Sequence, residues 1–186
     1  TPFDLAATQA ILFTSGTTGA PKGAMLSFGN HFWSATASAY RLGVTPTDRW
    51  LSCLPLYHVG GLAVLFRSCL YGTAVLLQSR FDAVTYHAAI DRQGVTLTSL
   101  VPTMLHRLLA TRERPWPSTL RLVLLGGAAA SPTLIREAAR QRLPVATTSG
   151  LTEATSQVAT ALPATVATNP GTVGNPLLFT TLRISN

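Results

Sequence analysis

The sequence predicts an α/β fold, with layered βα units around a largely parallel sheet. Strand-like and helix-like segments alternate along its 186 residues, a pattern typical of βαβ units. Hydrophobic residues make up 47% of the chain and charged residues only 11%, which indicates many segments buried on both faces, as in a sheet covered by helices. The length fits one domain with a substantial core. We find no internal repeat and no visible boundary.

Strands are expected where short apolar runs are bounded by turn residues. In chain order these runs are 9–14, 24–27, 50–54, 74–78, 96–100, 120–125, 145–148, 157–162 and 179–184. The run at 74–78 is expected to be buried, and 145–148 is expected to be the last strand of the core. The stretch 162–170 has the weakest periodicity and is expected to be a surface loop.

Helices are expected between these strands, at 30–41, 60–71, 82–93, 102–111 and 131–142. Asn30 and Asp82 are predicted N-caps, because their short side chains accept a hydrogen bond from a free amide of the first turn. Pro102 suits the first turn of a helix, and Ser131-Pro132 combines a capping residue with a proline at the first helical position.

Charge and cysteine content exclude several classes of protein. The net charge is +7, but the arginines are scattered singly and no aromatic residues are interleaved with them, which argues against a nucleic-acid partner. The apolar runs are interrupted before they reach membrane-spanning length. Cys53 and Cys69 show no spacing typical of a zinc site. We expect two free, buried thiols in a reducing cytoplasm.

The chain begins with Thr1, without an initiator methionine or a pattern of charged and then apolar targeting residues. We therefore expect it to be an internal part of a longer protein.

A loop rich in glycine and hydroxyl side chains, residues 14–23, is the most informative segment and contains the only lysine, Lys22. Glycines let successive backbone amides approach one anion, and hydroxyls and an ammonium add donors for phosphate oxygens. The predicted phosphate ligands are Thr14, Ser15, Gly16, Thr17, Thr18, Gly19 and Lys22. The loop is not a Walker A motif, since Pro21 and Gly23 occupy positions that require Gly and Ser or Thr. A flexible linker is the alternative.

Three further segments place small or polar residues after predicted strands. His58 lies between a strand end and an apolar helix, where α/β sheets bind ligands, although a lone histidine is more often structural. The small residues at 126–130 form a tight turn against which a flat ring could lie. Glu153, in the segment 148–153, is the only carboxylate after Glu137; taken alone, it indicates a solvated surface charge. The segment 171–176 indicates a turn and structural support.

Together these motifs, over residues from about 10 to 184, resemble those of the adenylate-forming enzymes, which include acyl- and aryl-CoA ligases, luciferases and peptide-synthetase adenylation domains. The resemblance implies that residues 1–186 form the central portion of the large, AMP-binding N-terminal domain. It also implies ATP, Mg²⁺ and CoA as ligands, and a small carboxylic acid as substrate. The small C-terminal domain, with its catalytic lysine, would be absent, and so would the ribose-binding aspartate. We therefore expect these residues alone to turn over little substrate.

The resemblance implies a role for each motif. Lys22, Thr152, Glu153 and His58 would be catalytic, with Thr152 on the nucleotide phosphate and Glu153 on Mg²⁺. His58, Gly60 and Gly61 would border the acid substrate. The nucleotide would also contact Gly126, Gly127, Ala128, Ser149 and Gly150. Ser149 departs from the family pattern, which usually has an aromatic residue there, so one face for stacking of the adenine is lost.

Within this family, the segments 54–72, 101–108 and 150–160 look most like those of the o-succinylbenzoate–CoA ligases of menaquinone biosynthesis. That substrate has two carboxylates, one activated and one only recognised. Arg67, in an otherwise apolar helix, is the expected partner of the second carboxylate, because a guanidinium matches a carboxylate in two hydrogen bonds. A surface arginine is the alternative reading. Another acyl- or aryl-CoA ligase, a peptide-synthetase domain and a non-catalytic nucleotide-binding module remain open as functions.

Overall fold

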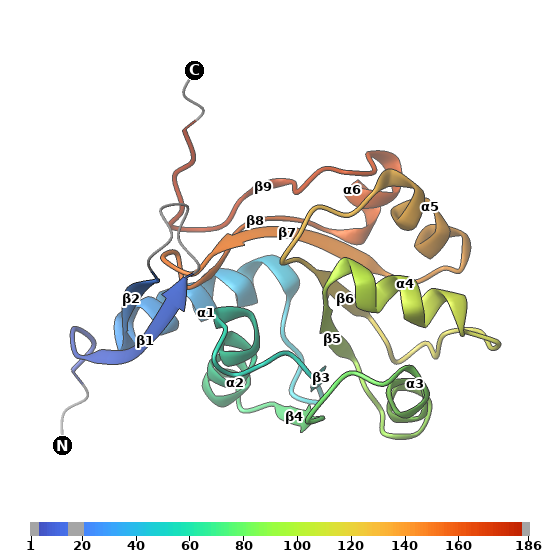
Figure 1. Cartoon of the computed structure of the whole chain (residues 1–186), viewed down its shortest axis with the longest axis horizontal. Helices are drawn as coiled ribbons and strands as arrows, with labels where there is room; N and C mark the ends of the chain where they lie inside the picture. Colours follow the sequence, from blue (N-terminus) through green and yellow to red (C-terminus); the bar gives the residue numbers. More distant parts are fainter. Residues whose placement is uncertain (1–3, 15–20, 184–186) are drawn as a thin grey trace.

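A mostly parallel sheet dominates the computed structural model, which describes residues 4–14 and 21–183 (Figure 1). Within that part of the chain the strand order is β4-β3-β5-β6-β7-β8-β9. The parallel strands are β3 (Arg49–Ser52), β4 (Ala74–Leu77), β5 (Leu97–Leu100), β6 (Leu122–Leu125) and β7 (Val145–Leu151). Two strands pair antiparallel, β8 (Ser156–Ala161) with β7 and β9 (Asn175–Pro176) with β8. The predicted α/β fold with a largely parallel sheet is confirmed.

Helices cover both faces of this sheet. The bounds are α1 (Phe28–Leu42), α2 (Val59–Tyr71), α3 (Ala83–Arg92), α4 (Pro102–Ala110), α5 (Pro132–Arg140) and α6 (Pro163–Thr168). Trp50 and Leu124 pack with Leu42 of α1 and Val64 of α2, whereas alternate strand residues such as Leu51 pack with α3, α4 and α5. Successive side chains of a strand point to opposite faces, so each buried strand contributes to both layers.

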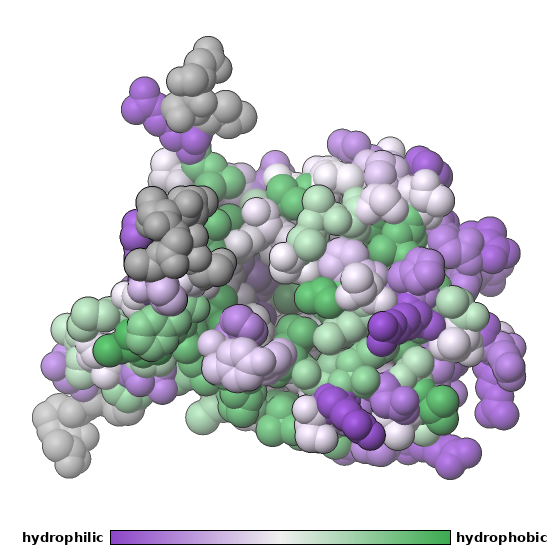
Figure 2. Space-filling model, viewed as in Figure 1, coloured by the Kyte–Doolittle hydropathy of each residue, from purple (hydrophilic) through white to green (hydrophobic). Residues whose placement is uncertain are grey.

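A separate two-stranded antiparallel sheet precedes α1. It consists of β1 (Thr8–Thr14) and β2 (Lys22–Ser27). Ile11 pairs with Met25, and both side chains are exposed, as is that of Phe13. Figure 2 shows hydrophobic residues gathered at this end of the molecule. Because β2 leads directly into α1, the strand that carries Lys22 is joined to the helical layer.

The predicted helix starts are confirmed except at α1. Asp82 caps α3, Ser131 caps α5, and prolines occupy the first turns of α4 and α5. In α1 the cap is Ser27, and the prediction of Asn30 was wrong. Asn30 is the third helical residue, and its side chain accepts a hydrogen bond from the Ser27 amide while the Ser27 hydroxyl accepts one from the Asn30 amide. This reciprocal capping box starts the helix two residues earlier than expected.

Several other predictions were wrong for identifiable reasons. Residues 163–168 form α6 rather than a loop, because Pro163 opens the helix and Val166 is buried in the core. No strand forms at 179–183, where Phe179 adopts a left-handed φ of 67°; Ile184 lies outside the described residues. Strand β4 is only half-buried, because it is the edge of the sheet.

The prediction for the cysteines holds in part. Both thiols are free and Cys53 is buried, but Cys69 is exposed on α2. Within the described ranges, no helix combines the length and the hydropathy that a membrane span requires.

An ion pair ties the layers together near the amino ends of β3 and β6. The Arg121 guanidinium donates to both carboxylate oxygens of Asp48, at 2.8 and 2.5 Å, and also to the carbonyls of Leu42 and Gly43 at the end of α1. Burial raises the pKa of Asp48, but hydrogen bonds from Arg121, Thr45 and Thr96 outweigh it and hold that pKa well below its usual range. These bonds stabilise the fold at the amino ends of the strands. A ligand site is therefore expected at the opposite edge of the sheet, where the strands have their carboxyl ends.

Candidate functional site

A cavity of ≈ 470 Å³ lies at the carboxyl ends of the parallel strands. Open α/β sheets bind ligands at this edge, and the volume suits a small molecule. The wall residues that strands β5, β6 and β7 and the loops after them contribute are Ser99, Leu100, Val101, Leu124, Gly126, Gly127, Thr148, Gly150, Leu151 and Thr152. The segment after β3 and the helix α2 add a second wall. The fold therefore brings segments that are almost a hundred residues apart in sequence to one cavity.

The first turn of α2 forms part of the second wall. His58 is the N-cap residue of α2, its side chain makes no capping hydrogen bond, and it lines the cavity. Gly60 and Gly61 also line it. Gly61 has a packing reason as well, because a Cβ there would lie 2.4 Å from the Pro55 carbonyl oxygen. Any larger residue would push the helix away from the preceding loop.

The turn after β6 supplies a flat wall without side chains. A Cβ on Gly126 would lie 2.8 Å from the Thr148 methyl carbon, so its absence lets β6 and β7 approach closely. Gly127 has a φ of 79°, a conformation that favours glycine. Both line the cavity, while the neighbouring Ala128 is exposed and is not among the lining residues.

Arg67 is the most unusual residue of the site. It is only 1% exposed, so the alternative of a surface arginine is wrong. It lines the cavity, one guanidinium nitrogen donates to the Ser156 hydroxyl at 3.1 Å, and the guanidinium lies 5.6 Å from the centre of the Trp50 ring. Among the described residues no carboxylate pairs with it, and its Nε has no hydrogen-bond partner.

Burial lowers the pKa of Arg67 to about 10, so the group keeps its charge at neutral pH. A buried cation without a counter-ion is costly, and an anionic ligand in the adjacent cavity would relieve that cost.

The turn between β7 and β8 brings the predicted phosphate residue Thr152 into the cavity wall, and the predicted metal residue Glu153 follows it in sequence. Gly150 and Thr152 line the cavity, whereas Ser149 is half-buried and does not, and Glu153 is exposed in the turn. A Cβ on Gly150 would lie 2.0 Å from the Ser156 carbonyl oxygen, at the point where the β7–β8 register shifts. Only glycine fits there.

Glu153 has the chemistry of a magnesium ligand, provided that phosphate oxygens supply further ligands. No group of three acidic, histidine or cysteine side chains in the described ranges could hold a metal alone. Magnesium often takes only one or two carboxylates together with phosphate oxygens. A single exposed carboxylate beside a cavity meets that pattern.

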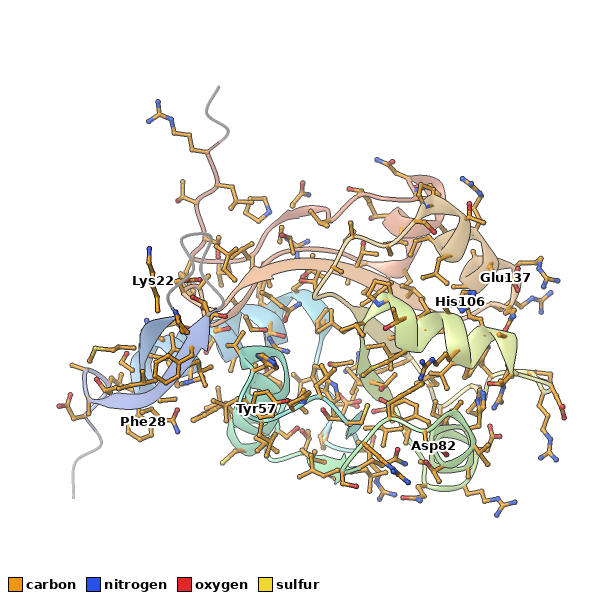
Figure 3. All side chains as sticks on the ribbon, viewed as in Figure 1. Lys22, Phe28, Tyr57, Asp82, His106 and Glu137 are labelled. Atoms are coloured by element: carbon orange, nitrogen blue, oxygen red, sulfur yellow. The ribbon has the colours of Figure 1, made fainter. Side chains whose placement is uncertain are left out.

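The glycine-rich loop is described only at its ends. Thr14 and Lys22 are paired across β1 and β2, and the Thr14 hydroxyl lies 3.4 Å from the Lys22 carbonyl oxygen. Lys22 is exposed at the start of β2 and is not a lining residue, and Figure 3 shows it at the opposite side of the view from His106 and Glu137. The predicted residues Ser15, Gly16, Thr17, Thr18 and Gly19 lie outside the described residues.

Sequence reasoning missed a polar network in the cavity wall. Thr148 donates to the Ala159 carbonyl, so Thr160 donates to Thr148 and in turn accepts from the Gln157 side-chain amide at 2.8 Å. The Gln157 side-chain nitrogen is therefore the donor to Thr160. The buried Gln157 side-chain oxygen has no hydrogen-bond partner among the described residues. The polar residues at 148, 157 and 160 in two consecutive strands were the available signal.

Comparison with known proteins agrees with these features. A model of the family described as "AMP-binding enzyme" matches residues 2–186. The 2-succinylbenzoate–CoA ligase of Bacillus licheniformis is 48% identical over 94% of this chain and 36% of the relative, and that of Bacillus pumilus is 44% identical over 99% and 38%. The chain thus spans little more than a third of the length of these relatives.

Solved structures give the same result. The o-succinylbenzoate CoA synthetase of Bacillus subtilis in complex with AMP has a TM-score of 0.90 and 43% identity, over 94% of this chain and 36% of that one. The same synthetase in complex with ATP and magnesium has a TM-score of 0.89, with 43% identity over 94% of this chain and 37% of the other. A third structure contains the acyl-adenylate intermediate OSB-AMP, with a TM-score of 0.90, 43% identity and coverage of 94% and 36%.

Proposed function

Since this chain belongs to the AMP-binding enzyme family, we propose that it is the central portion of the large N-terminal domain of an AMP-forming acid–thiol ligase. The proposed substrate is o-succinylbenzoate, which places the protein in menaquinone biosynthesis in the cytoplasm. The identities of 44–48% to 2-succinylbenzoate–CoA ligases support this choice. In the proposed reaction, the succinyl carboxylate attacks the α-phosphorus of ATP and pyrophosphate leaves. The CoA thiolate then attacks the acyl carbonyl and AMP leaves.

The observation that carries the proposal is the buried Arg67 in the cavity wall. A dicarboxylate can place one carboxylate on this guanidinium and leave the other free to react. His58 and Gly60 line the same cavity, so the acid would lie between them and Arg67. An acid with a single carboxylate cannot satisfy the arginine and react at the same time.

The nucleotide would occupy the part of the cavity between the β6 turn and the β7–β8 turn. Gly126 and Gly127 would offer backbone to the adenine, and Thr152 would offer a hydroxyl to a phosphate. Lys22, at the start of β2, would offer a compact charge to the outer phosphates. Glu153 would hold magnesium, which supplies neutralisation of the phosphate charge. The contribution of the protein is positioning and electrostatic stabilisation, which supply much of such catalysis.

Ser149 has a specific consequence in this proposal. The usual aromatic residue would give the adenine a face for stacking, and a serine does not. We therefore propose that the adenine is held by the glycine wall and by polar contacts, with a weaker affinity than an aromatic residue would give. A Ser149→Tyr variant tests this directly, because added stacking should lower the Kd for ATP.

ATP–pyrophosphate exchange by the full-length polypeptide that carries this chain tests the function. We expect exchange with o-succinylbenzoate and little with 4-oxo-4-phenylbutanoate, which keeps the reacting succinyl carboxylate and lacks the ring carboxylate. Arg67→Met should remove this discrimination, and Lys22→Ala and Glu153→Gln should each lower exchange. Equal exchange with 4-oxo-4-phenylbutanoate and o-succinylbenzoate would contradict the proposed substrate, and full activity in the Lys22 and Glu153 variants would contradict the proposed sites.

A further inference from the structure

The turn between β7 and β8 has a backbone that needs support. Thr155 has a φ of 56° and Ser156 a φ of 103°, and neither is a glycine. L-residues rarely adopt such angles, which cost about 1–3 kcal/mol each and persist only where the surroundings enforce them. This turn follows directly on Thr152 and Glu153, so whatever holds it also fixes those two side chains.

Two helices reach this turn with one side chain each. The Ser34 hydroxyl of α1 donates to the Thr155 carbonyl at 2.6 Å, across 121 positions of sequence. The Arg67 guanidinium of α2 donates to the Ser156 hydroxyl at 3.1 Å. Gly150 supports the turn from the opposite strand, because its lack of a Cβ admits the Ser156 carbonyl. Ser34, Arg67 and Gly150 therefore form a clamp around the two consecutive strained residues, Thr155 and Ser156.

Ser34 differs from the other members of this clamp, because it is not a lining residue of the cavity. It lies on a 15-residue helix that begins with a capping box, so its hydroxyl is presented from a rigid element. That same helix follows β2, the strand that starts with Lys22. Through Ser34, α1 thus joins the strand after the glycine-rich loop to the turn that carries Glu153.

We propose that Ser34 is a positioning residue for the nucleotide, which acts by fixing the backbone of residues 151–156 and does not touch the ligand. The inference rests on the proposed function for the identity of that ligand, Mg·ATP. Arg67 donates to the adjacent Ser156 and lines the cavity in which the acid would bind, whereas Ser34 donates to the Thr155 carbonyl and does not line the cavity. Loss of the Ser34 hydroxyl should therefore affect nucleotide affinity and leave the affinity for the acid unchanged.

The test compares three variants of the full-length polypeptide that carries this chain. Ser34→Ala removes the hydroxyl, Ser34→Thr keeps it, and Thr36→Ala is the matched control. Among the described residues, the Thr36 hydroxyl bonds only to the Phe32 carbonyl of its own helix. Hydrogen–deuterium exchange of the amides at 151–156 is measured without ligand. Calorimetry then gives the Kd values for Mg·ATP and for o-succinylbenzoate.

Ser34→Ala should speed exchange at 151–156 and raise the Kd for Mg·ATP by about threefold to tenfold, as expected for one lost hydrogen bond. Ser34→Thr and Thr36→Ala should stay close to the parent chain, and the Kd for the acid should not change. Unchanged exchange in Ser34→Ala overturns the inference, and so does faster exchange with an unchanged Kd for Mg·ATP. A full-length parent that binds no Mg·ATP contradicts the proposed function instead, and the exchange data still decide whether Ser34 holds the turn.

Discussion

Replacing Arg67 with methionine should stabilise the chain and abolish its recognition of a dicarboxylate. The guanidinium is 1% exposed, and burial lowers its pKa from 12.5 to about 10, which corresponds to about 3 kcal/mol against the folded state. The variant also loses the hydrogen bond to Ser156 and the contact with the Trp50 ring, about 2–3 kcal/mol together. Burial of an unbranched apolar side chain returns about 1–2 kcal/mol.

The net effect is a gain of about 1–3 kcal/mol in the free energy of unfolding, or about 6 °C in Tm for a chain of this length. Urea unfolding and calorimetric melting measure the gain. In parallel, the Kd for o-succinylbenzoate should rise on the order of 100-fold, since a desolvated charge contact is lost. A variant that is destabilised by several kcal/mol would show that Arg67 supports the fold, and an unchanged Kd would show that it does not bind the acid.

Three further predictions concern the structural elements around the site. Asp48→Asn should lower the free energy of unfolding by about 2–3 kcal/mol in urea, because it leaves Arg121 without its buried counter-ion. The exposed pair formed by Glu137 provides the control, and Glu137→Gln should leave the urea midpoint unchanged. The pKa of Asp48 is lowered, so its stabilisation is present above its unfolded pKa and should be lost in acid titrations as the pH falls below about 4; a parent and an Asp48→Asn variant with parallel acid transitions would contradict this. Gly150→Ala should reduce Tm and nucleotide affinity together, since its Cβ would meet the Ser156 carbonyl; a variant with parent-like melting would refute the geometry of the turn.

The sequence was sufficient for the parts of the fold that depend on local patterns. Buried parallel strands are short apolar runs, and such runs located β5 and β6 to within a few residues. Helix starts were found where one residue carries the signal, as Asp82 and Ser131 do. The start of α1 was misplaced because Ser27 and Asn30 form a reciprocal pair, and either one satisfies a single-residue rule.

The remaining errors have tertiary causes. Helix α6 is six residues long and is stabilised by the burial of Val166, which no local signal reports. Within the site, the motifs predicted which segments meet, and the cavity brings together His58, Gly126 and Thr152 as expected. The contact between Ser34 and Thr155 joins residues 121 positions apart with no motif at Ser34, so only the folded structure could reveal it.

The single lysine makes this chain unusually simple to label. Lys22 is exposed at the start of β2, and every other side-chain cation is an arginine or a histidine, so amine-selective acylating reagents have one side-chain target besides the N-terminus. A fluorophore or a mass tag introduced in this way would sit beside the glycine-rich loop. The reactivity of Lys22 with and without added nucleotide would then report on that loop directly, with no engineered cysteine and no background from other lysine side chains of this chain.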